Sequence, residues 1–377
     1  MMKKKNVFWC KNCLNMSTRP RISFDERGWC NACQWMEEKK TLNWESRQSE
    51  LNALIKRHKG KGDFDCIVTV SGGKDGSYVA HNLKTKYGLN PLCITIRPPL
   101  SLEIGDQNLN SFISKGFQHL HISVNQKSMQ ILDKIGFLEF GQGYYGWLIS
   151  IHTAVLRIAK KFGINLVFYS EDGEIEYGGG TSRKDIPTYG IEYMKNAYLN
   201  STYDHVINSS GLTKEELYWF EFDSKLYQDM DGLEVTHYSY YEAWDPYRNY
   251  LVAKEFCGLK EKDEAVVGTF TNFSQNDQEL ASLHYYLMYL KFGFGRATQD
   301  AGIEIRRGSM SRDQAVNLVN LFDNMPPTSG YQNYCNYYEI SMEEFLMTLD
   351  KFANKDLFEK IDGNWKPKFT VGTDFIL

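Results

Sequence analysis

The chain has 377 residues, of which 42% are hydrophobic and 24% charged, and its formal net charge is −4. This length predicts two or three structural units with one large buried core. The small negative charge argues against a broad basic surface for nucleic acid, and no apolar run approaches the ~18 residues of a membrane span. The basic start, Met1–Lys5, precedes no apolar segment of the secretory type. We therefore expect a cytoplasmic protein whose eight cysteines are reduced.

Four cysteines near the N-terminus are spaced C-x2-C-x16-C-x2-C: Cys10, Cys13, Cys30 and Cys33. Two thiolate pairs around a small hairpin, here within Ser17–Gly28, are typical of a tetrahedral zinc ribbon. An iron–sulfur cluster is the alternative, because four thiolates also hold such clusters. Four cysteine ligands close the coordination shell, so a catalytic metal is not expected here. The polar segment Trp35–Gly62 predicts a helix that links this ribbon to the main domain.

Further along, apolar runs alternate with helical periodicity. The predicted strands are Cys66–Val70, Leu92–Ile96, His119–Val124, Asn165–Ser170 and Glu264–Thr269. The predicted helices lie near Ser77–Tyr87, Gln107–Lys115, Gln126–Ile135 and Trp147–Phe162. This alternation predicts an α/β fold, a parallel sheet with helices on both faces. Ligands then bind beyond the carboxyl ends of the strands, where Ser71, Arg97 and Glu171 stand.

The segment Ser71–Ser77 reads Ser-Gly-Gly-Lys-Asp-Gly-Ser and lies between the first of these strands and its helix. Its adjacent glycines allow the backbone to approach a ligand closely, and the helix N-terminus attracts an anion. Lys74 adds a cation, while Asp75 and Ser77 add oxygens for a metal ion or a phosphate. The pattern is not a Walker A loop, which needs G-x-x-x-x-G-K-[ST]. We predict a loop that binds the pyrophosphate part of ATP.

Three other segments carry functional candidates. Gly141–Gly146 reads G-x-G-x-x-G, but Lys134–Phe140 before it is a poor strand and Glu171 follows too late for a dinucleotide site. We expect a flexible substrate loop facing the ATP cleft instead. Asp172–Tyr189 has three consecutive glycines among acids and hydroxyls, which fits a polar ligand, a metal or a solvated surface loop. His237–Tyr250 is rich in aromatic residues, which fits stacking on a sugar or a base, or core packing.

The last part of the chain is predicted to be helical. Gln278–Phe292 has helical periodicity, and Ser311–Gln314 and Ser341–Glu344 read as capping boxes. Phe292–Thr298 is predicted to be a short turn with one arginine. The pair Arg306 and Arg307 fits either a phosphate contact or a plain surface role. We divide the chain into a ribbon with the start of its linker (1–45), a PP-loop α/β domain (46–275) and a helical region (276–377).

The loop resembles the SGGxDS motif of the PP-loop ATP pyrophosphatases, although Gly76 stands where that motif has its final Ser. A narrower resemblance covers nearly the whole chain, which is similar to the N-acetyl sugar amidotransferase family of bacterial surface-glycan synthesis. The similar segments are the four-cysteine N-terminus, Val70–Tyr78, Glu176–Gly179, Trp244–Pro246 and Lys291–Thr298. Glu171–Gly173 departs from the Gly-Glu-Asn-Pro-like form of that family.

The resemblance implies an adenine nucleotide α-hydrolase-like domain and an ATP-dependent amidotransferase. Such an enzyme converts a sugar acetamido group to acetamidino for lipopolysaccharide O-antigen, pseudaminic acid or legionaminic acid, releasing AMP and pyrophosphate. No cysteine stands in a glutaminase-like elbow, so ammonia would come from solution or from a separate class I glutaminase subunit. The substrate would be a free or nucleotide-activated N-acetylated sugar. A tRNA-thiolating PP-loop enzyme is the alternative function.

The residues and the resemblance together give the candidate site. Catalytic roles fall to Lys74, Asp75, Glu171 and Glu176, with Asp75 helping to position Mg²⁺. The ATP-binding candidates are Ser71, Gly72, Gly73, Lys74, Asp75, Gly76, Ser77, Ile96 and Arg97. The substrate-binding candidates are Tyr177, Gly178, Gly179, Trp244, Asp245 and Arg296. Zn²⁺ is expected on Cys10, Cys13, Cys30 and Cys33.

Overall fold

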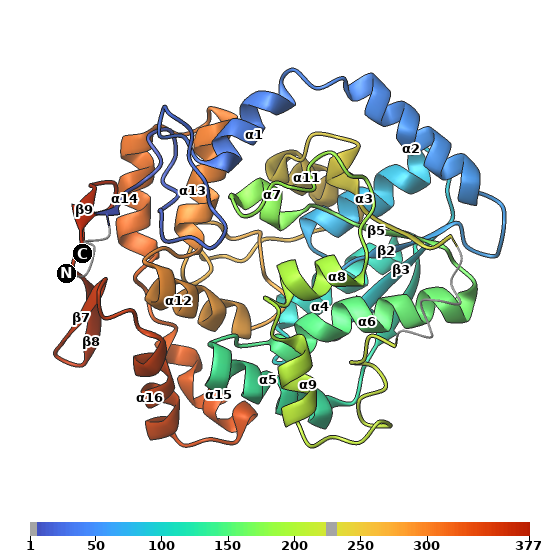
Figure 1. Cartoon of the computed structure of the whole chain (residues 1–377). Coiled ribbons are helices and arrows are strands. Elements are labelled where there is room, and N and C mark those ends of the chain that lie inside the picture. The colour runs from blue at the N-terminus through green and yellow to red at the C-terminus, as the bar shows by residue number, and fades with distance from the viewer. Residues whose placement is uncertain (1–5, 224–231) are drawn as a thin grey trace.

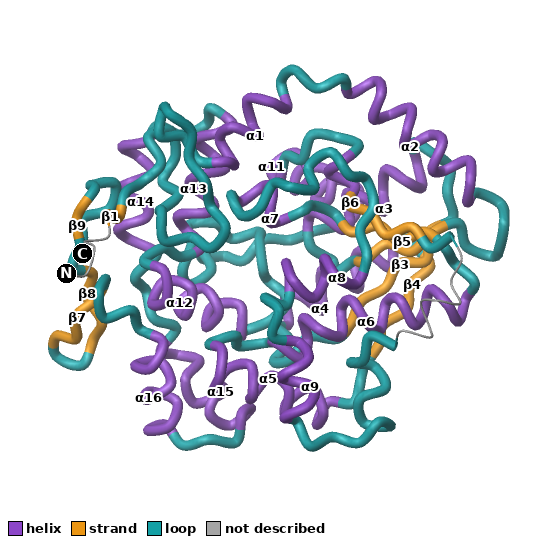
Figure 2. Tube along the Cα trace, viewed as in Figure 1, coloured by secondary structure: helices purple, strands orange, loops and turns teal. Residues whose placement is uncertain are grey.

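The computed structural model describes residues 6–223 and 232–377. Within these residues the central sheet has five parallel strands in the order β4-β3-β2-β5-β6 (Figures 1 and 2). The strands are β2 (Cys66–Thr69), β3 (Pro91–Ile96), β4 (Gln118–Ile122), β5 (Leu166–Tyr169) and β6 (Glu234–His237). Parallel strands joined through helices confirm the predicted α/β class.

Helices cover both faces of the sheet. Successive side chains of a strand point to opposite faces, and here the side chains on both faces are apolar and pack against helices. The covering helices are α2 (Trp44–His58), α3 (Lys74–Thr85), α4 (Glu103–Ser114), α5 (Gln126–Phe140) and α6 (Tyr145–Phe162). Ile67 and Val167 pack into one apolar cluster with residues of α5 and α6. Val68 and Phe168 pack into another cluster with residues of α2, α3 and α4. The strands are therefore apolar throughout, as a buried parallel sheet requires.

Short elements follow the fourth strand in the chain and surround the carboxyl ends of the sheet. They are α7 (Gly173–Tyr177), α8 (Ile191–Tyr193), η1 (Met194–Tyr198), α9 (Tyr203–Ser209), η2 (Tyr238–Tyr240), α11 (Pro246–Val252) and η3 (Ala253–Cys257). The aromatic segment His237–Tyr250 was predicted either to stack on a ligand or to pack in the core. Tyr238 and Tyr241 of this segment are buried in the apolar cluster that contains residues of α2, α3 and α4.

The C-terminal region is helical, as predicted. Its elements are α12 (Leu280–Phe292), α13 (Arg296–Arg307), α14 (Arg312–Phe322), η4 (Thr328–Gly330), α15 (Tyr331–Tyr338), α16 (Met342–Phe352) and the hairpin β7 (Phe358–Ile361) and β8 (Asn364–Pro367). Ser311 and Gln314 form both bonds of a capping box, and Ser341 accepts a bond from the Glu344 amide. The turn predicted over Phe292–Thr298 is shorter than expected, because α13 begins at Arg296.

The N-terminal module lies against this helical region (Figure 1). It contains α1 (Asn31–Lys39) and β1 (Asn6–Val7), which pairs antiparallel with β9 (Phe375–Ile376). Trp9, Leu14 and Met16 are buried in the apolar cluster of the C-terminal helices. Ribbon and helical region therefore share one core.

Two expectations about elements are wrong, and one strand was not predicted. Trp35–Gly62 is not one helix: α1 and α2 are separate, and Asn43 caps α2 by accepting a bond from Ser46. Glu264–Thr269 is a set of local turns rather than a strand, with Gly268 at φ +93°. The last strand of the sheet is instead β6, which the sequence analysis missed. Among the described residues, no helix has both the length and the apolar character needed to cross a membrane.

Candidate functional site

The predicted phosphate loop connects β2 to α3 at the carboxyl edge of the sheet. Its glycines are fixed by packing against the protein as well as by backbone conformation. Gly72 has φ +80°, and a Cβ there would lie 2.5 Å from the Leu109 amide nitrogen of α4. A Cβ on Gly76 would lie 2.5 Å from the Thr69 carbonyl oxygen. Gly73 is less confined, since its nearest neighbour would be the Ser71 hydroxyl at 3.2 Å. Gly73 is therefore the glycine that leaves room for a ligand.

A cleft of about 240 Å³ opens beside this loop. The predicted site residues that line it are Ser71, Gly73, Lys74, Asp75, Gly76, Ile96 and Glu171. The opposite wall includes residues 273–277, which the sequence analysis did not single out. Burial raises the pKa of Asp277 in that wall to about 6. The cleft thus lies beyond the strand ends, as the fold class predicts.

Asp75 is the best-anchored side chain of the cleft. Its Oδ1 accepts bonds from Trp244 Nε1 at 3.0 Å and from Asn249 Nδ2 at 2.8 Å. Its Oδ2 pairs with the Lys74 ammonium. Trp244, which was predicted to bind substrate, thus holds the loop carboxylate in place. Asn249 was missed, because only the packing of α11 against α3 brings it to the loop.

The ionisable side chains of Lys74 and Glu171 influence each other's pKa. Burial alone would lower the pKa of Lys74, but the Asp75, Tyr177 and Glu171 side chains raise it above its ordinary value. Burial and the neighbouring Asp75 carboxylate raise the pKa of Glu171 to about 8. Glu171 is therefore largely a neutral acid at neutral pH, and an added cation would favour its ionised form.

Ser77 and Arg97 differ from the rest of the predicted ATP site. Ser77 is 1% exposed and its Oγ has no partner among the described residues. It does not line the cleft, and neither does Gly72 or Arg97. Arg97 is exposed. The structure thus brings most of the predicted loop residues to the cleft but does not place these three in its wall.

Three predicted substrate residues form one cluster at the side of the cleft. The Tyr177 ring lies 5.8 Å from the Trp244 ring and 5.4 Å from the guanidinium carbon of Arg296. Arg296 is 8% exposed and pairs with Asp300 at 2.9 Å. This cluster contains two aromatic rings and one buried cation, and none of its three residues lines the cleft.

The other predicted substrate residues have structural contacts. Asp245 caps α11 and pairs with Arg307 at 3.1 Å. Gly178 has φ +96°, and a Cβ there would lie 2.6 Å from Asn15 Nδ2 of the ribbon. Gly179 accepts a bond from the Asn31 side chain. The absence of a Cβ at Gly178 therefore lets the ribbon pack onto the α7 segment, whereas a Cβ on Gly179 would meet the Glu174 side chain of that segment itself.

Glu176 does not reach the cleft. Its carboxylate accepts bonds from Lys39 Nζ at 2.7 Å and Trp35 Nε1 at 3.0 Å, both on α1. The side chains of Glu176 and Lys39 are 6% and 4% exposed. Arg306, for which a surface or phosphate-binding position was expected, donates to the Glu176 carbonyl at 3.1 Å. These bonds connect the ribbon, α7 and α13 at one point.

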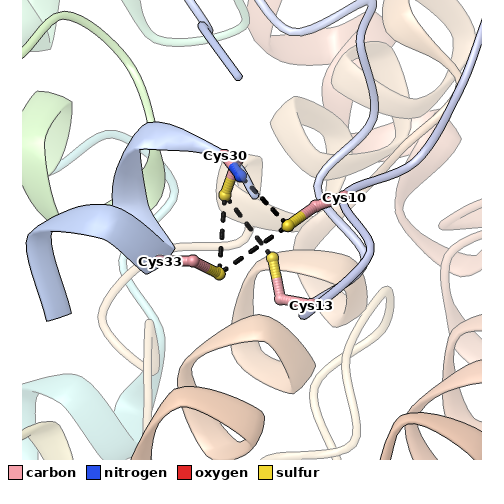
Figure 3. A group of neighbouring side chains, drawn as sticks. All are labelled: Cys10, Cys13, Cys30 and Cys33. Atoms are coloured by element: carbon pink, nitrogen blue, oxygen red, sulfur yellow. Dashed lines mark hydrogen bonds between the residues drawn. The ribbon is translucent and has the colours of Figure 1, made fainter. Parts of the chain in front are cut away.

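The four predicted metal ligands converge (Figure 3). Their sulfurs lie 3.8 Å apart for Cys10 and Cys33, 3.6 Å for Cys13 and Cys30, and 3.7 Å for Cys30 and Cys33. Sulfurs on one tetrahedral ion with bonds of ~2.3 Å lie about 3.8 Å apart. A multi-iron cluster holds its thiolates on different iron atoms and so spreads them further. The cysteines therefore fit one tetrahedral metal ion.

Amide groups surround these sulfurs and orient them. Asn12 Nδ2 donates to Cys33 and Asn15 Nδ2 to Cys30, each at 3.3 Å. The Cys30 amide donates to Cys10 at 3.1 Å. Such bonds favour the thiolate form that a metal ion needs. Asn15 also donates to the Tyr177 carbonyl at 3.0 Å, which joins the metal site to the edge of the cleft.

Comparison with protein families gives one match. Residues 267–370 match the family described as LPS biosynthesis protein WbpG-like, C-terminal domain. This match supports the resemblance seen in the sequence for the C-terminal helical region alone.

Individual relatives are more distant. An uncharacterized protein of Methanocaldococcus jannaschii is 33% identical over 89 residues, which are 23% of this chain and 32% of that protein. The chain thus spans about a third of the length of that relative.

Two solved structures are similar over longer stretches. A predicted subunit of tRNA methyltransferase from Methanocaldococcus jannaschii has TM-score 0.30 and 18% identity, covering 59% of this chain and 86% of its own. The U34-tRNA thiolase NcsA from Methanococcus maripaludis, with its 4Fe-4S cluster, has TM-score 0.29 and 14% identity, covering 70% and 79%. At these TM-scores the likeness carries no argument, and the fold assignment rests on the sheet order and the loop.

Proposed function

We propose that this chain, a member of the N-acetyl sugar amidotransferase family, uses ATP to convert a sugar acetamido group to acetamidino during bacterial surface-glycan synthesis. The observation that carries the proposal is the cleft formed by the Ser71–Ser77 loop. There, Lys74 and the anchored Asp75 face Glu171, and the family-specific Trp244 holds Asp75. The match of residues 267–370 to an LPS biosynthesis domain supports the glycan role.

The loop fits the pyrophosphate part of ATP. Gly73 leaves space above the N-terminus of α3, a helix of 12 residues whose dipole favours an anion. Lys74 supplies the cation that stabilises negative charge developing on the leaving pyrophosphate. Of the three carboxylates that line the cleft, Asp75, Glu171 and Asp277, the first two would hold Mg²⁺, which supplies further charge neutralisation when bound.

The reaction then has two steps. The acetamido oxygen attacks the α-phosphate, and the bond to pyrophosphate breaks. Ammonia adds to the activated carbon, the bond from carbon to the AMP oxygen breaks, and a proton is lost to leave the amidine. In this proposal Tyr177 and Arg296, which contact each other, hold the sugar. The proposal includes a separate class I glutaminase as the ammonia source and a cytoplasmic location.

The ribbon is proposed to hold Zn²⁺ as a structural ion. The sulfur spacing supports one tetrahedral ion, and four thiolates leave no position for a substrate. None of the eight cysteines, all within the described residues, lines the cleft. A thiolating enzyme would need a reactive sulfur there, so this observation disfavours the tRNA alternative.

The test uses the full chain with ATP, Mg²⁺, ammonium chloride and a set of nucleotide-activated N-acetylated hexosamines. We expect AMP and pyrophosphate to form only when a sugar is present, and mass spectrometry to show one oxygen replaced by NH. AMP formation with tRNA and a sulfur donor, but with none of the sugars, would reject the proposal.

A further inference from the structure

The cleft wall opposite the Ser71–Ser77 loop takes no part in the proposed binding of ATP. Residues 273–277 belong to this wall. They precede α12 and lie within residues 267–370, the stretch that matches the LPS biosynthesis domain, whereas the loop lies outside that stretch. A wall that faces the loop and belongs to the glycan-related part of the chain is a natural place for an acceptor to be recognised.

Asp277 of this wall is fastened to the connection between β3 and α4. Its carbonyl accepts a bond from the Leu102 amide at 3.0 Å, and the next residue, Gln278, pairs with Ser101 in an antiparallel bridge. A Cβ on Gly105 would lie 2.5 Å from the Asp277 Cα, so the first turn of α4 packs directly on this residue. The backbone of Asp277 therefore has a fixed place in the cleft wall.

The charges of the cleft leave the Asp277 carboxylate without a counter-ion. Among the described residues that line the cleft, Lys74 is the one cation, and it pairs with Asp75. Glu171 is largely neutral at neutral pH, because burial and the Asp75 carboxylate raise its pKa to about 8. Burial raises the pKa of Asp277 only to about 6, so this carboxylate is largely ionised. The cleft thus carries one ionised carboxylate whose charge no described lining residue balances.

Asp277 stands apart from the charges beside the loop. Those charges shift the pKa of Glu171, whereas no charged side chain among the described residues shifts that of Asp277. Burial and the Asp277 carboxylate raise the pKa of Tyr144, so these two side chains lie near each other. The Tyr144 ring lies 5.6 Å from the ring of Trp147, which lines the cleft. Asp277 and Trp147 therefore share one end of the cleft, and a carboxylate beside an aromatic ring suits an organic cation.

Tyr144 belongs to the Gly141–Gly146 motif, which was expected to face the ATP cleft. None of residues 141–146 lines the cleft. The glycines of the motif serve helix packing: Gly141 ends α5 with φ +61°, and a Cβ on Gly146 would lie 2.8 Å from the Met129 carbonyl oxygen of α5. The motif thus fixes the start of α6, from which the following residue, Trp147, reaches the cleft.

The acceptor of the proposed reaction becomes an organic cation. When the acetamido oxygen bonds to the α-phosphorus, the bond to pyrophosphate breaks and pyrophosphate leaves with the electron pair. The nitrogen lone pair then delocalises towards the activated carbon, so the group carries a positive charge on its N–H. Ammonia adds to that carbon, AMP leaves with the electron pair of the carbon–oxygen bond, and one proton is lost. The product at neutral pH is the protonated amidine, which keeps the same positive charge.

We propose that Asp277 is a further catalytic residue, whose carboxylate holds the positive charge of the activated acceptor beside the ring of Trp147. The inference rests on the proposed function and names the part of the chain that selects a secondary amide. Lys74 and Asp277 then divide the charges of the reaction. Negative charge leaves with pyrophosphate at the loop, and positive charge develops at the opposite wall. A carboxylate fixed in advance stabilises that charge without reorganisation.

The first experiment measures recognition of the charge without turnover. N-methylacetamidinium chloride and N-methylacetamide, which have nearly the same shape, are titrated by NMR into the full chain with Mg²⁺ and a non-hydrolysable ATP analogue. We expect the cation to bind about tenfold more tightly than the neutral amide, and Asp277→Asn to lose this advantage. Asp313→Asn, at an exposed position of α14, is the control and should keep it. Equal binding of both compounds to the wild type, or an unchanged advantage in Asp277→Asn, overturns the inference.

The second experiment separates acceptor recognition from metal binding. In Asp277→Asn we expect AMP formation with the sugar to fall by about 10²–10³-fold, while the affinity for Mg²⁺ with the ATP analogue stays unchanged. A weaker Mg²⁺ affinity would make this carboxylate a metal ligand and overturn the inference, as would a variant as active as the wild type. Absence of AMP formation in the wild type counts against the proposed function alone, because the amidinium titration still decides whether Asp277 recognises a cation.

Discussion

The proposed metal site and the proposed nucleotide cleft of this protein are built in opposite ways. All four thiolates come from residues 10–33, and their amide donors Asn12 and Asn15 come from the same stretch. The cleft draws on residues 69–76, 94–108, 147–171 and 259–277. A site made from one short segment depends on its own sequence, whereas a site made from four segments depends on the whole fold.

The two sites are nevertheless connected. Glu176 binds Lys39 and Trp35 of the ribbon helix, and the next residue, Tyr177, belongs to the cleft cluster. The difference between a local and a distributed site can therefore be tested by asking which substitutions affect one site and which affect both.

The largest effect is expected when a ligand of the local site is lost. Cys30→Ser should release the bound metal, lower the melting temperature and weaken binding of an ATP analogue, because α7 loses its support. Metal content by mass spectrometry, melting and calorimetry measure the three effects. Cys257→Ser, at another buried cysteine, should keep its metal. Full ATP-analogue affinity in metal-free Cys30→Ser would show that the sites are independent.

Removing the connection comes next. Glu176→Gln leaves the buried Lys39 ammonium without its partner, which should cost about 3–5 kcal/mol in the free energy of unfolding. Chemical denaturation measures this cost. The double variant Glu176→Gln with Lys39→Met should recover most of it, since no unpaired charge remains. If Glu176→Gln abolishes turnover with no loss of stability, Glu176 acts in the chemistry after all.

Substitution within the distributed site should affect activity more than stability. Lys74→Ala removes the cation nearest the developing charge and should reduce AMP formation by about 10²–10³-fold. Its free energy of unfolding should fall less than that of Glu176→Gln, because Asp75 loses its cation partner but keeps its bonds from Trp244 and Asn249. Lys86→Ala, at the exposed end of the same helix, is the matched control and should retain activity. Equal rates for the two variants would remove Lys74 from the mechanism.

The smallest effect concerns pH. The pKa of Glu171 is raised from 4.5 to about 8, so a proton competes with Mg²⁺ for its carboxylate below that pH. Affinity for Mg²⁺ with an ATP analogue should therefore increase as pH rises towards 8, by at most about tenfold per unit, and level off above it. In Glu171→Gln the dependence should disappear. Calorimetry measures this affinity. A wild-type Mg²⁺ affinity that stays constant from about one pH unit below neutrality to about one unit above it would contradict the prediction.

Features that come from one short segment could be predicted from the sequence, whereas features that combine distant segments could not. The cysteine spacing and the Ser71–Ser77 loop are local patterns. The four sulfurs converge as expected, and most of the loop lines the cleft, although Gly72 and Ser77 do not. Trp244 was recognised as a family feature, but its bond to Asp75 depends on how α11 packs against α3. Asn249 and Asp277 have no distinguishing neighbours in sequence, so only tertiary packing reveals them. Glu176 was predicted to be catalytic because it is an acid followed by glycines. The sequence does not show that Lys39, 137 residues earlier, pairs with it in the folded protein.

The pairing of β1 with β9 has a consequence for the order of folding. The Trp9 amide donates to Asp374 at 3.0 Å across a sequence separation of 365 residues, and the Trp9 ring packs on Phe369 and Phe375. A ribosome releases the cysteines long before these partners. Contacts of such long range form slowly, since a large loop must close first. The four cysteines of residues 10–33 are therefore synthesised, and free to converge, long before the pairing of β1 with β9 can complete this module.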